Sequence, residues 1–394
     1  GISAYGARPE AVDRVRKMAT MGLRRFAGLR KALRQRRNFA GGFLVAEIPE
    51  VKEATACSER GDWTSATQLL GRAKGFLEAV PPLKIKVMCR LADTLQLAGD
   101  INAEIRERKE IVSVVESAGD PILKHVSWCY IISLLRGSEI DRAIALCEET
   151  RRTCEEGTWE STVSALVHAV VLMHHNTRAE EALGAIADAE RHAQQEGQVH
   201  GECSLIAGRY HAMVAQDEEE ARAAFQTAEE ILTSLSSSSS SEGVDERRRK
   251  VGLAVALASQ GSEEKLNKAI KCLEEADDDL GSLMISNVLR ALARVRMVKG
   301  DGVVAEGLYR SILSKLNSKP SSVFQKQLHV LSLRDYARLL EGMEWNNRSR
   351  KAEGEKLMDQ AASIDDGMPK LLLPYESMVD HWFVETYGQT DRIA

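Results

Sequence analysis

The chain has 394 residues, of which 44% are hydrophobic and 5% aromatic, and its formal net charge is −5. This composition excludes a disordered or fibrous chain and provides enough apolar material for a sizeable core. The seven cysteines are scattered, so we expect neither a disulfide framework nor a zinc-binding CxxC pair, and a reducing compartment fits best. No apolar stretch approaches the roughly 20 residues that span a bilayer. We therefore expect a soluble or membrane-peripheral protein.

The first predicted element is a basic amphipathic segment near the amino end. Residues 18–46 contain no Asp or Glu but seven Arg or Lys, and their apolar residues recur at helical spacing. This composition is typical of a mitochondrial transit peptide, and residues 1–39 are predicted to be such a peptide or a basic amphipathic segment. The stretch ends in a sequence that resembles the site cut by the mitochondrial processing peptidase. We predict cleavage between Phe39 and Ala40.

Three other interpretations of this segment stay open: a nucleic-acid-binding arm, a helix that lies on a membrane surface, and a plastid address. Residues 1–39 carry eleven Arg or Lys and two Asp or Glu, so their removal lowers the net charge from −5 to −14. So acidic a body argues against nucleic acid as the partner. The predicted location is mitochondrial, in the matrix or associated with the inner membrane, and a cytoplasmic location is the alternative.

From Ile48 onward, paired helical patterns predict an all-α fold. The second segment of several pairs carries a small residue, followed four and seven positions later by residues that share its helical stripe. The first residue must be small because the two helices cross closest there. These repeat-packing positions are Ala66, Ala143, Ala182, Ala221, Ala269 and Ala305. Ala143, Ala182 and Ala221 are spaced 39 residues apart, and the distance from Ala66 to Ala143 implies one more pair between them.

Gly-Asp dipeptides precede the second segment of three pairs, at Gly61 and Asp62, at Gly99 and Asp100, and at Gly300 and Asp301. Glycine tolerates the left-handed conformation that ends one helix, and aspartate caps the next. Each dipeptide therefore predicts a tight turn between two antiparallel helices.

At these positions the chain resembles the tetratricopeptide repeat superfamily over roughly residues 47–362. It departs from the superfamily in its period, about 38 to 39 residues instead of 34, and at Glu104, which occupies an expected small position. The resemblance implies an α-solenoid of antiparallel helix pairs, a TPR-like superhelix that binds other proteins; a related type of helix-pair repeat is the alternative. The basic amino end, size and repeat count are similar to those of the mitochondrial members that assist the assembly and upkeep of respiratory complex III.

The predicted helical repeat domain covers residues 40–367 and contains a flexible Ser-rich loop at 234–245. The basic residues 247–250 after that loop are interpreted as a solvated helix face. Residues 368–394, with their aromatic residues, are predicted to be a C-terminal capping segment or tail. Two alternatives for the tail stay open: a partner-binding segment, and a segment that lies in the protein's own groove.

The sequence offers no pattern for chemistry. It contains no phosphate-binding loop and no GxSxG turn. His174 and His175 point about 100° apart on a helix, and His168 and Asp188 are too distant in sequence to pair by spacing. We predict no catalytic, cofactor-binding or metal-binding residues and no enzyme activity. Some TPR proteins hold chaperone tails through Lys, Arg and Asn on their first helices, and only Arg90 is of that type here, so such binding is not expected.

The predicted function is that of a non-catalytic protein–protein interaction adaptor in mitochondria, which assists the assembly or maintenance of a protein complex. A structural subunit of a large organellar assembly and a cytosolic or nuclear repeat scaffold are the alternatives. The expected partner is a protein, with no cofactor and no nucleic acid. A position at the periphery of a membrane complex is compatible with this interpretation.

Overall fold

The structure, a computed structural model of the chain, describes residues 45–193, 197–235, 246–276, 279–317, 322–345, 348–366, 368 and 377–388. The predicted transit peptide at 1–39 and its cleavage site between Phe39 and Ala40 lie outside these residues. So does most of the predicted Ser-rich loop, of which only Ser234 and Leu235 are described.

The described residues confirm the predicted all-α fold, in which successive helices pack as antiparallel pairs. The pairs are α2 (Pro49–Glu59) with α3 (Trp63–Phe76), α4 (Pro81–Ala98) with α5 (Ile101–Ala118), α6 (Leu123–Arg136) with α7 (Ile140–Arg152), α8 (Trp159–Met173) with α9 (Glu181–Ala193), α10 (Gly197–Tyr210) with α11 (Glu218–Ser234), α12 (Glu246–Ser259) with α13 (Glu263–Ala276), α14 (Asp279–Val298) with α15 (Gly302–Asn317), and α16 (Val323–Glu341) with α17 (Lys351–Asp365).

A few short elements supplement the pairs. The 3-10 helix η1 (Val45–Glu47) precedes α2, and the π-helical turn η2 (His211–Ala215) continues α10. Between α16 and α17 the chain forms an antiparallel two-stranded ladder of β1 (Glu344–Trp345) and β2 (Arg348–Ser349), which the sequence analysis did not predict. The last described helix is α18 (Met378–Tyr387).

The predicted Gly-Asp turns are confirmed. Gly61, Gly99 and Gly300 have φ angles of 75°, 82° and 80°, the left-handed conformation in which a side chain would be strained. The carboxylates of Asp62 and Asp100 accept backbone N–H bonds from the third residue of the following helix, at 3.1 and 3.0 Å. These bonds satisfy donors that a helix start leaves free, so each turn ends one helix and begins the next.

The six predicted repeat-packing alanines all lie on the second helix of a pair. They are 0 to 5% exposed: Ala66, Ala143, Ala182, Ala221, Ala269 and Ala305. Larger apolar side chains on the same stripes, such as Leu70, Phe225 and Tyr309, are also buried. The helices of each pair thus approach closely at one point and interlock above and below it.

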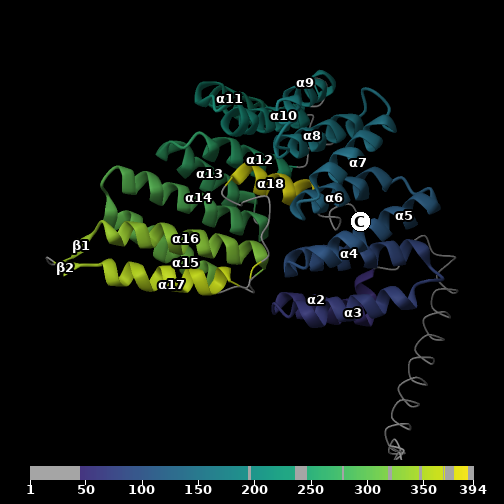
Figure 1. Cartoon of the computed structure of the whole chain (residues 1–394), viewed down its shortest axis with the longest axis horizontal. Coiled ribbons are helices and arrows are strands. Elements are labelled where there is room, and N and C mark those ends of the chain that lie inside the picture. Colours follow the sequence, from purple (N-terminus) through teal and green to yellow (C-terminus); the bar gives the residue numbers. More distant parts are fainter. Residues whose placement is uncertain are drawn as a thin grey trace, which may run out of the picture.

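The stacked pairs curve into an arch whose two ends approach each other (Figure 1). The first helices of neighbouring pairs contact one another along the inner side, as α8 does with both α6 and α10. Near the ends, α16 contacts α4, and Val323 and Phe324 pack against Leu97. The two ends of the arch are therefore in contact, through residues that lie more than half of the chain apart in sequence.

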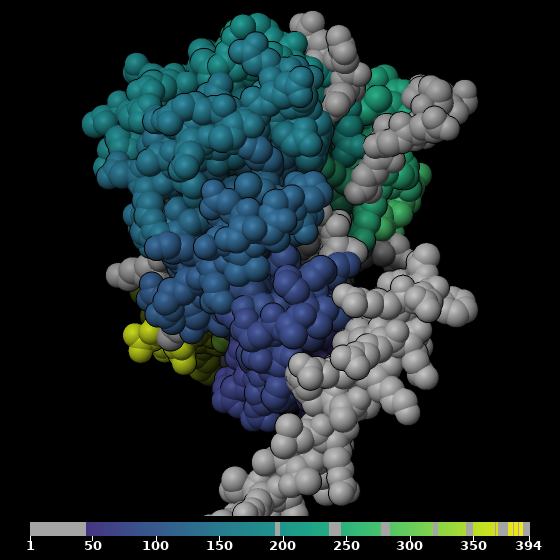
Figure 2. All heavy atoms as spheres, turned by 90° about the vertical axis from the view of Figure 1, so that its right-hand side faces the viewer, coloured from purple at the N-terminus to yellow at the C-terminus, as the bar shows by residue number. Residues whose placement is uncertain are grey.

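The outer surface of the amino-terminal half is continuous, from α2 at the bottom to the helices at the top of the arch (Figure 2). The second helices of the pairs supply much of this outer layer, because the first helices line the inner side. In the described part of the chain, no helix combines the length and apolar character needed to cross a membrane.

Candidate functional site

The inner face of the arch is occupied by the chain's own helix α18. This helix contacts α6, α10, α12 and α14, all of them first helices of their pairs. Figure 1 shows α18 in the middle of the arch, next to helices that lie far from it in the sequence. Its apolar residues Val379, Trp382, Phe383, Val384 and Tyr387 are 0 to 2% exposed. Residues 377–388 therefore lie in the protein's own groove, one of the two alternatives left open for the segment 368–394.

The first turn of α18 is fixed by an ion pair with α10. Ser377 caps the helix by accepting the backbone N–H of Asp380 at 3.3 Å. The Asp380 carboxylate, 4% exposed, accepts two hydrogen bonds from Arg209, from Nε at 3.0 Å and from Nη2 at 2.6 Å. A bidentate, largely desolvated pair of this kind fixes orientation as well as position. It therefore sets the register of α18 along the groove.

The last turn of α18 is held by a buried phenol. The Tyr387 hydroxyl donates to the Glu202 carboxylate of α10 and accepts from Arg248 Nη2 of α12 at 2.6 Å. Arg248 also donates through Nε to Glu202 at 2.7 Å, and its guanidinium carbon lies 4.9 Å from the centre of the Tyr387 ring. Burial raises the pKa of Tyr387 well above its ordinary value, against the opposing charge of Arg248. The phenol therefore remains a neutral hydrogen-bond donor at physiological pH.

The carbonyl end of α18 meets a buried cluster of charges, which we name the closure junction: Asp93 and Gln96 of α4, Glu104 and Arg108 of α5, and Arg136 of α6. Arg108 Nη2 donates to the Gly388 carbonyl at 2.8 Å, to Asp93 at 3.0 Å and to the Gln96 side-chain oxygen at 2.8 Å. The side chains of Arg108, Glu104 and Arg136 are 1% exposed. Burial alone would lower the pKa of Arg108, but the adjacent carboxylates hold it above its ordinary value.

Glu104 explains the break in the small-residue pattern. Its carboxylate accepts from Arg108 Nε at 3.2 Å, from the Ser133 hydroxyl at 2.6 Å and from Arg136 Nη1 at 2.8 Å. The guanidinium carbon of Arg136 lies 5.3 Å from the ring centre of Phe324, on α16. The second pair thus has a buried carboxylate of the closure junction at the position where other pairs have a small packing residue. The two ends of the arch meet at this junction.

The interpretation of the basic residues 247–250 as a solvated helix face is wrong for Arg248 and Arg249. Arg248 binds Glu202 and Tyr387, and Arg249, 4% exposed, donates to the Leu232 carbonyl at 2.8 Å and to Glu246. These two arginines hold the groove and the helix start, and they are not a solvated face. Sequence spacing could not reveal this, because Glu202, Tyr387 and Leu232 lie on other helices.

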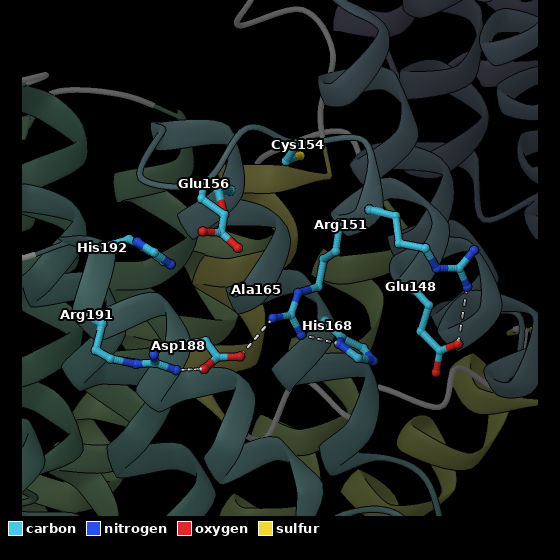
Figure 3. A pocket seen from close by; sticks show the side chains of 11 residues that line it. Glu148, Arg151, Cys154, Glu156, Ala165, His168, Asp188, Arg191 and His192 are labelled. Atoms are coloured by element: carbon cyan, nitrogen blue, oxygen red, sulfur yellow. Dashed lines mark hydrogen bonds and ion pairs between the residues drawn. The ribbon is translucent and has the colours of Figure 1, made fainter.

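A second site lies on the outer side, between α7, α8 and α9 (Figure 3). It is an open pocket of about 610 Å³ in which three arginines are matched by three acids. Arg151 extends between Asp188, to which it donates at 2.9 Å, and His168 Nδ1, at 3.1 Å. The structure thus brings His168 and Asp188 to one arginine, although their separation in sequence gave no such indication.

The electrostatics of this pocket do not favour a ligand of either sign. Burial, and then the charge of Arg151, lower the pKa of His168 to about 4, so the imidazole is neutral at physiological pH. In Figure 3, Arg191 reaches Asp188 from the side opposite Arg151. Within the described residues, no group of three or more His, Cys, Asp or Glu could hold a metal ion.

The groove and its bound helix define the class of this protein: an α-solenoid of antiparallel helix pairs whose inner face holds a helical segment. No family model matches the chain, and a search of curated proteins gives no match. Among solved structures, the chain is similar to a tetratricopeptide repeat protein from Parabacteroides merdae ATCC 43184, with a TM-score of 0.37 and 11% identity over 79% of this chain and 97% of that one.

Proposed function

We propose that this protein is a non-catalytic interaction scaffold whose inner face binds a helical segment of a protein partner. The observation that carries the proposal is the binding of α18. The inner face buries the aromatic side chains of α18 and pairs Asp380 with Arg209. It also donates hydrogen bonds from Arg248 to the Tyr387 hydroxyl and from Arg108 to the Gly388 carbonyl. A surface that binds a helix through apolar pockets and oriented arginines has the features of a helix-in-groove recognition site.

We further propose that the scaffold works in mitochondria, in the matrix or at the inner membrane, as an adaptor for the assembly or maintenance of a protein complex of the respiratory complex III type. The support is the basic, acid-free segment at 18–46, together with the acidity of the remaining chain. An acidic body disfavours nucleic acid and is compatible with a protein partner.

Two measurements on the native protein test this proposal. Peptide mass spectrometry of fractionated organelles should find an amino terminus at or just after Ala40 in the mitochondrial fraction. Native size separation of the same fraction should place the protein in a complex larger than its own 43.5 kDa. Peptides from residues 18–39 that persist in the cytosol would refute the mitochondrial address, and a protein that migrates only as a free monomer would refute the scaffold.

A further inference from the structure

Helix α18 resembles a bound peptide ligand more than it resembles one of the paired repeat helices. It has ten residues, and isolated helices of that length are not stable in water. Residues 366–377 separate it from α17 in the sequence, and the helices that it contacts are α6, α10, α12 and α14. Its position therefore depends on the contacts that the groove itself provides.

Two arginines of the groove that bind α18 are partly exposed to solvent. The side chains of Arg209 and Arg248 are 18% and 20% exposed, whereas their partners Asp380 and Glu202 are 4% and 2% exposed. The aromatic residues beneath them are fully buried. A competing helix with an acid in its first turn can therefore engage Arg209 from solvent before its apolar face displaces that of α18.

The closure junction is incompletely matched by α18. In the described structure of this junction, four buried donors have no hydrogen-bond partner: Arg108 Nη1, Arg136 Nε, Arg136 Nη2 and Gln96 Nε2. All three side chains are 1% exposed. Arg108 Nη2 donates to the neutral carbonyl of Gly388, and it divides its hydrogen bonds among three acceptors. Buried donors without acceptors lose hydration without compensation, so an occupant with stronger acceptors would be bound better.

A carboxylate at the end of the helix is the group that fits this place. One oxygen would take the position of the Gly388 carbonyl, 2.8 Å from Arg108 Nη2. The second would add an acceptor beside a guanidinium group whose Nη1 has no hydrogen-bond partner in the described structure. Guanidinium groups bind carboxylates in a bidentate, charge-assisted manner, more strongly than they bind a carbonyl.

We infer that α18 is an exchangeable occupant of the groove, and that the partner is a helix with the aromatic face and first-turn acid of α18 whose last turn ends in a carboxylate. This inference rests on the proposed scaffold function and specifies its partner. Bound α18 keeps the groove closed, and the partner helix takes its place.

Two synthetic peptides test the inference on the full chain. Both have the sequence of residues 377–388 and an amino-terminal fluorophore; one ends in a free carboxylate at Gly388 and the other in an amide. The full chain is used as wild type, as Asp380→Arg, which sets two arginines against each other and releases α18, and as Asp359→Arg, the same change at an exposed position on α17.

Fluorescence anisotropy should show that the Asp380→Arg chain binds the free-acid peptide, while wild type and Asp359→Arg bind it at least tenfold more weakly because α18 competes. On the Asp380→Arg chain the amidated peptide should bind about tenfold more weakly than the free acid. Equal affinity for the two peptides would overturn the carboxylate assignment. Rapid hydrogen exchange of the α18 amides would show that Asp380→Arg releases the helix. If that chain still binds neither peptide, the proposed replacement of α18 by a partner helix is overturned.

A measurement on the unmodified chain covers the case in which Asp380→Arg fails to fold. Saturating free-acid peptide should raise the hydrogen exchange of the α18 amides more than tenfold, and unchanged exchange would reject the inference. Concentration-dependent dimers that form by exchange of α18 would also reject it, because the occupant would then be a second copy. Partners that cross-link to the inner-face helices of a chain that binds neither peptide would overturn the inference but leave the scaffold function standing.

Discussion

Replacing Glu104 with alanine should destabilise the amino-terminal half of the arch severely. The carboxylate is 1% exposed and accepts hydrogen bonds from Arg108, Ser133 and Arg136. Its removal leaves two buried guanidinium groups with Asp93 as the remaining acid of the closure junction. Removing one member of a buried ion pair typically costs about 3 to 5 kcal/mol, because the remaining charge stays desolvated. We expect the free energy of unfolding to fall by about that amount.

The assay is urea unfolding followed by circular dichroism, with hydrogen exchange to locate the loss. Faster exchange should centre on α4, α5 and α6, because stability in a stacked array is divided among neighbouring pairs. Glu104→Gln, which keeps the shape and one acceptor, should cost less. Glu110→Ala on the same helix is the matched control; this side chain is 46% exposed and pairs with Lys74, so about 1 kcal/mol or less is expected. Equal losses for Glu104→Ala and Glu110→Ala would refute the role of the closure junction.

Three further predictions concern packing and pH. Gly208→Ala should lower the melting temperature, since its new carbon would lie 2.6 Å from the Phe225 ring, whereas Gly184→Ala, with free space around it, should raise it slightly; the opposite order would contradict the packing described. Ala221→Leu should overpack the α10–α11 crossing and cost about 1 to 3 kcal/mol in urea unfolding, and an unchanged midpoint would mean that the stripe is misplaced. The pKa of His168 is lowered from 6.5 to about 4 in the folded chain, so between these pH values only the unfolded chain binds the proton. The free energy of unfolding should therefore fall as the pH falls from 6.5 to 4. His168→Gln should reduce this pH dependence, and an equal dependence in both chains would exclude the buried neutral imidazole.

Much of the fold could be predicted because it depends on local patterns. The spacing of Ala143, Ala182 and Ala221 and the Gly-Asp turns are determined by the crossing of adjacent helices and by helix ends. The last pair, α16 with α17, lacks the alanine pattern of most other pairs and has no Gly-Asp turn. Gly354 and Ala361 are the small buried residues of α17, and a short β-ladder joins the two helices. Gly354 lies so close to the Ala337 carbonyl that an added carbon would be 3.0 Å away, which accounts for glycine there.

The residues that line the groove could not be predicted, because its contacts join residues far apart in the chain. Arg108 and Gly388 are 280 residues apart, and Arg209 and Asp380 are 171 apart. One signal was present in the sequence: Glu104 interrupts a position that elsewhere carries a small residue. A buried acid requires cations, but nothing in the local sequence identified Arg136 as one of them. The aromatic tail was a second signal, and its place on the inner face depends on the curvature of the whole arch.

The central claim, that the inner face binds a protein partner, is tested most directly by quantitative capture from the native cells. The full chain would be expressed with an affinity tag as wild type, as Asp380→Arg and as the surface control Asp359→Arg, and co-purifying proteins would be measured by mass spectrometry. We predict a defined set of partners that rises several-fold with Asp380→Arg and is unchanged with Asp359→Arg. Identical partners in identical amounts for all three chains would contradict the claim.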